Sequence, residues 1–563
     1  MKRFTLFFLG ILLSAQFVFA GGLVHNTNQS AAWSRMLSRG ATLEIDAVYY
    51  NPAGLTKLSD GFHISVSNQS IFQTQTIMSS YPYLNNDTYT GTISAPLFPS
   101  IYMAYKTGRW AFSFGFLPLG GGGGATFDKG VPYMEVPIAS LVPAFSEMGV
   151  TGYSVDMEFK GSSVYWSVQA GISFEINENV SLFAGARYIM AKNTYTGYIK
   201  NITLLRDDAH GGNLPANDFM NGVAKQATDG AAQATAGAGM ATGAGISMQP
   251  IIDGGGGVLT WDQAVAMGVI TAEQSAQLQG GLLQFGFTQE QIDAMDMSQA
   301  QGSYYGTATY LTGMAADLLV QAGQLTAGAS LMGDQEGDIT QTGSGITPII
   351  GANFSFMNDR LNFGLKYEFE TKLDLVNDVP AGKGFAIGIN PDATPVYLYP
   401  DGDTINADIP AMLSIGMDYQ LFEPFKVSLT YHTYFDKQTA WANPDNEPRV
   451  IEKNFWEFAI GFEYDINDDF LVSTGYLRAK TGVNQNYQSN LGFSLSTNTI
   501  ALGGAYKIND MFKLNLGAYF VSYDKEVYDM YEGSGNSVIP YYESYLKSTW
   551  AISVGVDITI GSK

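Results

Sequence analysis

Two cationic side chains in the middle of alternating strands, Arg187 and Lys366, carry the best-defined chemistry in the sequence. Each follows a glycine, Gly185 or Gly364, by two residues, and side chains two apart on a strand share a face. If the glycines face inward, the cations do too. A cation in an apolar or small-residue pocket would hold a ligand carboxylate by charge-assisted hydrogen bonds. The alternative is an internal ion-pair network, because Glu368 and Glu370 share the face of Lys366.

Signatures of enzymes are scarce. The sequence holds no Gly-x-Ser-x-Gly elbow, no His-Glu-x-x-His and no P-loop, and its four histidines have no metal-ligand spacing. A group of acidic and amide side chains lacks the EF-hand spacing and is expected to be a solvated loop rather than a calcium site; it comprises Asp401, Asp403, Asn406 and Asp408. We therefore expect no enzyme, no metal and no cofactor.

The N-terminal segment and the composition place the chain outside the cytoplasm. Residues 1–20 carry Lys2 and Arg3, an apolar run and a small-residue end at Ala20, which is typical of a secretory signal peptide. No cysteine occurs in 563 residues, so no disulfide staples the fold. Aromatic residues reach 13% while charged residues are 14%, which suits a lipid-facing surface with aromatic girdles. The net charge of -23 argues against nucleic acid as a partner.

A recurring hairpin pattern predicts the strands. An aromatic residue, any residue, Ile-Asn, an acidic residue, any residue and an apolar residue recur at 174–180, 464–470 and 506–512, and looser matches lie at 106–109, 357–360 and 421–424. Asn and Asp tolerate the backbone of tight turns. Six short turns pair twelve strands, and one strand before and one after give about fourteen.

Alternation with a period of two assigns the faces of the strands. In the last strand Trp550, Ile552 and Val554 share one face, while Ser553 and Gly555 share the other. A soluble, secreted all-β protein would turn the apolar face inward. A membrane barrel of this size turns it to lipid and lines its lumen with the polar face, which is the arrangement we expect.

The short turns alternate with long connections, which is typical of outer-membrane barrels. The connections lie near 79–96, 119–152, 200–344, 376–404, 438–451, 481–492 and 526–546. The insertion at 200–344 is too long to lack structure. Its Gly/Ala-rich first part, including 236–240 and 254–257, predicts a flexible linker, and capping boxes at Thr260, Thr271 and Thr288 predict helices in its second part. A self-packed helical cap and a capture site for hydrophobic ligands both fit it.

The third strand ends in a proline followed by a run of glycines. Pro118 removes a backbone donor, and Gly120 and Gly121 begin a stretch that cannot sustain regular pairing. The strand is expected to kink there, and the alternative is an ordinary loop that begins at the same place.

The residues 21–60 lie between the signal peptide and the first strand, with a short helix expected near Ala31 to Leu37. They contain Asn51, Pro52, Ala53 and Gly54, where Pro52 restricts Asn51 and Gly54 permits a left-handed turn, so a rigid bend is expected. At this motif, and in its position ahead of a barrel pattern, the sequence resembles the FadL/TodX family of outer-membrane transporters for hydrophobic compounds.

The resemblance implies an all-β fold, a transmembrane antiparallel barrel of 14 strands over 61–563, plugged by an N-terminal hatch over 21–60 and carrying the partly helical extracellular insertion. It also implies passive uptake of long-chain fatty acids or other hydrophobic compounds across the outer membrane of a Gram-negative bacterium, with release through a kinked third strand. The implied partners are hydrophobic small molecules, outer-membrane lipid and the barrel-assembly machinery. A general porin, or a non-transporting adhesin whose long loops carry the function, remains the alternative.

Overall fold

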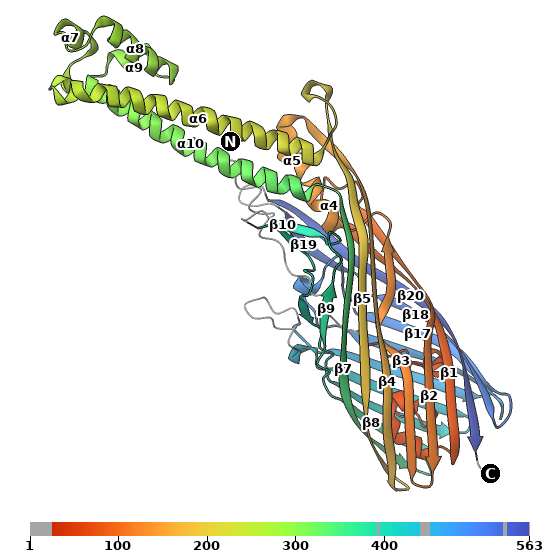
Figure 1. Cartoon of the computed structure of the whole chain (residues 1–563). Coiled ribbons are helices and arrows are strands. Elements are labelled where there is room, and N and C mark those ends of the chain that lie inside the picture. The colour runs from red at the N-terminus through yellow and green to blue at the C-terminus, as the bar shows by residue number, and fades with distance from the viewer. Residues whose placement is uncertain (1–24, 391–393, 440–450, 533–537, 562–563) are drawn as a thin grey trace. The chain divides into compact units, whose positions relative to one another are not determined.

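A computed structural model describes residues 25–390, 394–439, 451–532 and 538–561, so the predicted signal peptide lies outside the described residues. Fourteen antiparallel strands form one closed barrel, because the first, β1, pairs with both the second and the last (Figure 1). These strands are β1 (Gly61–Ser79), β2 (Thr88–Thr107), β3 (Trp110–Phe127), β4 (Val150–Asn177), β5 (Val180–Arg206), β7 (Gln335–Phe356), β8 (Leu361–Glu368), β13 (Met412–Phe422), β14 (Phe425–Tyr434), β15 (Phe455–Asp465), β16 (Phe470–Lys480), β17 (Thr497–Lys507), β18 (Phe512–Tyr523) and β20 (Ile539–Gly561). The predicted fold class is confirmed.

The predicted short turns are confirmed. They join β2 to β3, β4 to β5, β7 to β8, β13 to β14, β15 to β16 and β17 to β18. Between β7 and β8 the chain passes through Met357, Asn358 and Asp359 with positive φ, which short polar side chains tolerate best. All six turns therefore lie at one end of the barrel, which we call the short-turn end, and the longer connections lie at the other.

The two faces of the strands differ as predicted. On β20, Trp550 and Ile552 are about half exposed, whereas Ala551 and Ser553 between them are buried. The same alternation of exposed apolar and buried small or polar residues runs through β1, β16 and β18. A closed barrel with an apolar outer face and a polar inner face is a membrane barrel.

Several strands extend beyond the 9 to 11 residues that cross a bilayer. The strand β4 has 28 residues and β5 has 27, and β3 continues to Phe127, so the second long connection begins later than predicted. The connections hold α4 (Pro132–Ala139), α5 (Leu141–Ala144), η2 (Ser146–Met148), β9 (Asp374–Asp378), β10 (Ala386–Ile389), β11 (Pro395–Tyr397), β12 (Thr404–Asn406), η5 (Asp436–Gln438), η7 (Gln485–Tyr487) and β19 (Glu526–Glu532).

Residues 25–60 fill the barrel lumen, and we call them the plug. The expected short helix is α2 (Ala31–Met36), and Ser30 caps it by accepting a hydrogen bond from the Trp33 amide at 2.9 Å. The helix α3 (Ala47–Tyr50) and the 3-10 helix η1 (Pro52–Lys57) follow. The plug side chains in α2, α3 and most of η1 are buried, so the lumen is a packed core here.

The expected role of Gly54 in the bend was wrong. Asn51 is outside the helical region and Pro52 opens η1, but Gly54 does not have a left-handed φ. A Cβ on Gly54 would lie 2.5 Å from Asn51 Nδ2 and 2.9 Å from the Thr42 carbonyl oxygen. Gly54 is therefore required by close packing and not by backbone conformation.

Glycines of the barrel wall lie directly against the plug backbone. A Cβ on Gly475 would lie 2.0 Å from the Met36 carbonyl oxygen, and one on Gly416 would lie 2.0 Å from the carbonyl carbon of Gly40. The same close approach occurs at five more wall glycines, Gly364, Gly461, Gly503, Gly517 and Gly555, each with a plug atom 2.1–2.9 Å from the added carbon. These seven residues, which we call the wall glycines, let the plug contact the strands without intervening side chains.

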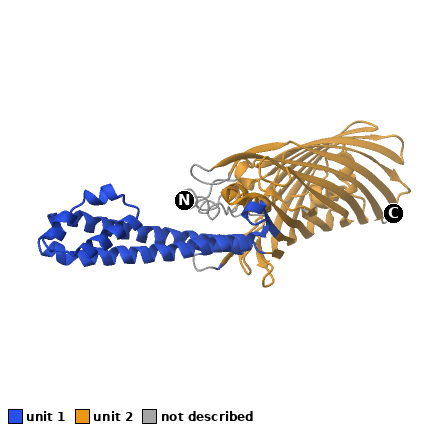
Figure 2. Cartoon of the chain, turned by 90° about the horizontal axis from the view of Figure 1, so that it is seen from above, with its two compact units in different colours: residues 1–12, 202–333, 388–394 blue, residues 13–201, 334–387, 395–563 orange. Residues whose placement is uncertain are grey.

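The insertion belongs to a separate compact unit, which among the described residues covers 202–333 together with 388–390 and Thr394 (Figure 2). After η3 (Asp208–His210) and β6 (Leu214–Pro215), its main elements are two long helices that pack against each other, α6 (Ala216–Asp253) and α10 (Met297–Leu331). The predicted flexible linker over 236–240 was wrong, because it lies inside α6. Buried alanines recur every seven residues on both helices, which is the spacing of a coiled-coil seam: Ala227, Ala234 and Ala241 on α6, and Ala308, Ala315 and Ala322 on α10.

Between the end of α6 and the start of α10 the chain forms a small helical cluster with its own core. The segment 254–257, also predicted as linker, leads into η4 (Gly256–Val258), and α7 (Trp261–Ala266), α8 (Ala272–Gln284) and α9 (Gln289–Asp293) follow. The capping boxes predicted at Thr260, Thr271 and Thr288 are all present. Trp261 is buried and donates its indole N–H to the Ile292 carbonyl at 2.7 Å. Among the described helices of the chain, none is long and apolar enough to cross a bilayer.

Candidate functional site

Arg187 and Lys366 face the lumen as predicted and form a buried ion-pair cluster with Glu368. The Arg187 guanidinium makes two bonds to the Glu368 carboxylate, at 2.6 and 3.0 Å, and Lys366 Nζ lies 2.8 Å from the same group. Both cations also lie over the ring of Tyr49 in the plug, and Lys366 donates to the Tyr49 carbonyl at 2.6 Å. The network that was the alternative to carboxylate binding is therefore present, and it joins the wall to the plug.

The hatch motif makes a second junction between plug and wall. Asn51 Nδ2 donates to the Asn353 side chain on β7 at 2.8 Å and to the Thr42 carbonyl at 3.1 Å. The Pro52 carbonyl accepts a hydrogen bond from Ser173 on β4 at 2.6 Å, and Ala53 is completely buried. These residues fix the plug in place and do not line the cavity described below.

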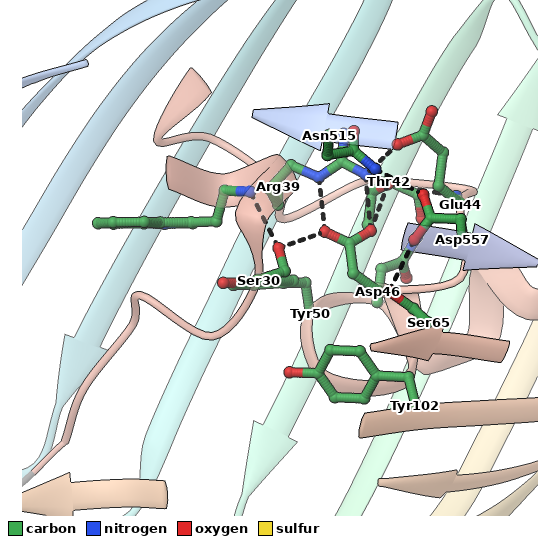
Figure 3. A network of polar contacts seen from close by, with 12 residues as sticks. Ser30, Arg39, Thr42, Glu44, Asp46, Tyr50, Ser65, Tyr102, Asn515 and Asp557 are labelled. Atoms are coloured by element: carbon green, nitrogen blue, oxygen red, sulfur yellow. Dashed lines mark hydrogen bonds and ion pairs between the residues drawn. The ribbon is translucent and has the colours of Figure 1, made fainter. Parts of the chain in front are cut away.

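Charged groups near the short-turn end connect the plug to the side of the wall opposite the cluster of Arg187, Lys366 and Glu368. Arg39 binds both oxygens of Asp46, at 2.9 and 2.6 Å, and Ser30 donates to the same carboxylate (Figure 3). Burial raises the pKa of Glu44, but Lys513 and Arg39 outweigh that effect and hold the pKa well below its ordinary value. Glu44 is thus an anion that pairs with a lysine of β18.

Arg35 adds the most deeply buried of these contacts. Its guanidinium pairs with Glu463 on β15 and donates to Ser473 on β16 at 3.0 Å. The guanidinium is fully buried, and Lys426 pairs with the same carboxylate at 2.5 Å. Removing one partner of a buried ion pair leaves an uncompensated charge, so this contact strongly favours a seated plug.

The pairing of β2 with β3 is interrupted at the residues predicted to kink. Ile93 pairs with Ala125 and Ile101 pairs with Phe116, but no pairs join the two strands between these positions. Pairing of β3 with β4 is also irregular from Pro118 to Gly123. The backbone groups of β3 in this stretch need other partners, because unpaired polar groups are costly in a membrane wall.

The first residues of the plug supply those partners. His25 forms an isolated antiparallel bridge with Gly120, and the Asn26 amide donates to the Leu119 carbonyl at 2.9 Å. The Asn26 side chain donates to the Gly121 carbonyl at 2.8 Å. A third carbonyl, that of Pro118, accepts from the side chain of Gln29 at 3.0 Å. The N-terminal segment therefore occupies the edge of β3 that β2 leaves unpaired.

A cavity of about 360 Å³ lies beside this segment. On the lumen side it is lined by Trp33 and Tyr519, which contact each other edge to face. It is also lined by Leu97 and Trp166, which belong to the outward faces of β2 and β4, and Leu97 is 77% exposed. The cavity therefore extends from the lumen to the outer face of the wall at the interrupted pairing.

The lining of the cavity is apolar with a few polar groups, the usual composition of a small-molecule site. Its apolar residues include Ile71, Phe98, Phe455, Leu477, Leu495 and Val521, and its polar ones include Asn28, Gln73, Thr499 and Thr549. The predicted residues Pro118, Gly120 and Gly121 line it, whereas Arg187, Lys366 and the hatch motif do not. We take this cavity as the candidate binding site.

Most of the lining residues were not identified from the sequence. His25 and Asn26 reach the site only because the plug folds back onto a strand more than ninety positions later, and no local pattern announces that contact. The wall glycines did carry a signal, since six of the seven recur one to a strand on β13, β15, β16, β17, β18 and β20. Glycine in the middle of a strand marks a close backbone approach.

Comparison with solved structures places the fold. The structure is similar to that of a Pseudomonas aeruginosa FadL homologue, with a TM-score of 0.54 and 13% sequence identity, over 96% of this chain and 100% of that one. It also matches the Pseudomonas putida toluene transporter TodX, with a TM-score of 0.48 and 12% identity over 97% of this chain and 100% of that one. Neither a family model nor a curated protein sequence matches this chain. At this identity the likeness to the FadL homologue shows a shared fold.

Proposed function

We propose that this chain belongs to the FadL/TodX family and is a transport protein of the Gram-negative outer membrane, for the passive uptake of hydrophobic molecules such as long-chain fatty acids. The observation that carries the proposal is the cavity at the interrupted pairing of β2 and β3, lined from the lumen by Trp33 and from the outer face by Leu97. An apolar molecule gains free energy whenever it leaves water for such a site. A water-filled pore offers no such gain.

The uptake has three steps. Molecules are first collected on apolar extracellular residues, among which Met240, Ile246 and Tyr310 of the insertion are each more than half exposed. They then enter the cavity. Release follows sideways into the membrane when residues 25–29 leave the edge of β3, because among the described residues three hydrogen bonds, two from Asn26 and one from Gln29, hold that edge.

The carboxylate-binding role of Arg187 and Lys366 stays a prediction. In this arrangement Glu368 and the plug already occupy both cations. A ligand carboxylate would have to replace Glu368, so this role requires a displaced plug. It is tested by the affinity of the protein for oleate with and without a Lys366→Met change.

The sideways release is tested with a disulfide, which the absence of native cysteines makes clean. Asn26 and Leu119 lie opposite each other across the antiparallel bridge of His25 and Gly120, and such pairs have Cα separations that a disulfide spans. We expect the Asn26→Cys, Leu119→Cys protein to lose uptake of labelled oleate and oleyl alcohol when oxidised and to regain it with reductant. Unchanged uptake in the oxidised protein would exclude release past this segment.

The porin and the adhesin are separated from the transporter by two measurements. A porin gives steady large currents in planar bilayers with its plug in place, whereas the packed lumen described here should give none. Cells that lack the gene should take up less of the labelled hydrophobic molecules, and an adhesin predicts no change.

The two single-cysteine proteins, treated with the same oxidant, are the matched controls for the disulfide experiment.

A further inference from the structure

The ionisable side chains that line the cavity are acidic. Asp436 and Glu457 both line it, and among the described residues no lysine or arginine does. The cavity lining also includes His25, which could carry a positive charge, but burial lowers the pKa of His25 to about 4. It is therefore neutral at neutral pH. A ligand in the cavity meets carboxylates and no compensating cation.

Glu457 offers one free acceptor to the cavity. Its Oε2 atom accepts from the Tyr434 hydroxyl at 3.3 Å and lies 3.1 Å from His432 Nδ1. Its Oε1 atom has no hydrogen-bond partner among the described residues. The side chain stays in place because Tyr434 packs against the ring of His25, with 4.7 Å between the ring centroids. Glu457 is thus a positioned carboxylate at the cavity wall.

Asp436 offers a second hydrogen-bond acceptor without a partner. It is 1% exposed, and its Oδ2 atom accepts from the Phe455 amide at 2.9 Å, while its Oδ1 atom is buried without a partner. An unpaired buried carboxylate oxygen is costly, so a donor that reaches it gains more than an ordinary hydrogen bond. Burial raises the pKa of Asp436 to about 7, so both of its protonation states occur at neutral pH. Phe455 and Glu457 lie two apart on β15 and bring the two carboxyl groups to the same wall.

We propose, resting on the uptake function above, that this cavity selects neutral hydrophobic molecules that carry a hydroxyl group over fatty-acid anions. A hydroxyl donates to Glu457 Oε1 or Asp436 Oδ1, whereas a ligand carboxylate has no proton to donate and is repelled by Glu457 and by the ionised form of Asp436. A lumen-facing lysine on β20 does not offset this. Lys547 does not line the cavity, and its ammonium donates to the Phe493 carbonyl at 2.6 Å and lies over the Phe493 ring.

Three ligands of one chain length test separately whether the cavity favours a hydroxyl and whether it disfavours a carboxylate. They are the dibrominated forms of oleyl alcohol, methyl oleate and oleate. Bromine quenches tryptophan fluorescence at short range, and the quenching that disappears in a Trp33→Phe variant reports on the cavity. Titrations of the full protein in nanodiscs at about pH 9 keep the acid ionised. We expect the alcohol to bind roughly tenfold tighter than the ester, which lacks the donor, and the ester to bind tighter than the carboxylate.

Two variants test whether the named carboxyl groups cause this order. In the Asp436→Asn, Glu457→Gln protein the carboxylate should bind within about twofold of the ester, because the repelling charges are gone. The matched control is Glu543→Gln, which neutralises a buried carboxyl that binds Tyr545 and Asn490 and does not line the cavity. Its order of affinities should equal that of the unchanged protein.

The outcomes are distinguishable. If none of the three ligands quenches Trp33, the cavity does not bind hydrophobic molecules and the proposed function itself fails. If they quench but the carboxylate binds as tightly as the ester, or the alcohol no tighter than the ester, the selectivity is wrong and the uptake function stands. The order measured on the unchanged protein decides this even if the double variant does not fold.

Discussion

The barrel wall and the helical insertion are both rich in glycine, but the glycines do different work in the two regions. At Gly475 and Gly416 of the wall an added Cβ would collide with plug backbone at 2.0 Å. At Gly239, Gly243 and other positions on α6 and α10, an added Cβ would meet no atom within 4 Å. The same residue type is thus a requirement of packing at the wall glycines and unconstrained at many positions of the helix pair.

The difference shows where each region obtains its stability. The plug is held because the wall lacks side chains where the two backbones meet, and because buried charges such as Arg35 and Glu463 bridge them. The helix pair is held by its alanine seam, at Ala234 and Ala315 for example, while its exposed glycines cost about 1 kcal/mol each relative to alanine. Substitutions should therefore destabilise the first region and stabilise the second.

The largest expected effect is that of Gly475→Leu. The new side chain begins 2.0 Å from the Met36 carbonyl oxygen, on a backbone that cannot move aside within a closed sheet, so the plug cannot seat. We expect the closed barrel to become a conducting pore, seen as steady ion currents in planar bilayers. Gly239→Leu is the matched control and should leave the membrane without current. A silent Gly475→Leu barrel would contradict the packing that we ascribe to the wall glycines.

The next largest effect is that of Arg35→Met. Loss of the buried guanidinium leaves Glu463 with Lys426 alone and should weaken the plug by about 3 kcal/mol, since breaking a buried pair typically costs 3–5. Hydrogen exchange of the amides of residues 31–57 measures the change. Arg478→Met removes a pair with Asp524 that is partly exposed and should cost less than about 1 kcal/mol. Equal effects of the two changes would show that burial does not set the strength of the pair.

A gain is expected from Gly239→Ala in α6. The change should stabilise the helix by about 1 kcal/mol, because alanine loses less backbone entropy there and meets no neighbour. Protection of the α6 amides from hydrogen exchange in the full-length protein should rise. Gly245→Ala is the internal control, since its new methyl carbon would lie 2.9 Å from the ring of Tyr305 and should cancel the gain.

The smallest effect is that of Lys225→Met on the same helix. The change removes an exposed pair with Asp229 four residues later, at 2.7 Å, and should cost about 0.3 kcal/mol. The same exchange measurement, made at low and at high salt, checks it. A loss that exceeds that of Arg35→Met would reverse the ranking of the two regions.

The strands were predictable because their information is local. Asn and acidic residues between Phe174 and Val180 identify a turn on their own, and the alternation of Trp550, Ala551 and Ile552 assigns faces without knowledge of any partner. The inward orientation of Arg187 and Lys366 followed from the same rule. Their pairing with Glu368 was foreseen only as an alternative, because a shared face does not fix which side chains touch.

The insertion shows how composition can mislead. The segment 236–240 is rich in glycine and alanine, as linkers are, but Ala227, Ala234 and Ala241 repeat at the seven-residue spacing that α10 repeats as well. Periodicity, not composition, decides between helix and linker here. The cavity could not be predicted by either argument, because the contact of His25 with Gly120 depends on how the plug folds back into the completed barrel.

The wall glycines also constrain the order in which the protein is built. At the wall glycines, which lie on strands from β8 to β20, the gap between the wall and the plug is smaller than a methyl group. A closed barrel therefore leaves little space for a plug that enters late. We therefore expect the plug to be in place before β20 pairs with β1, and the chain order, in which the plug precedes every strand of the barrel, allows this.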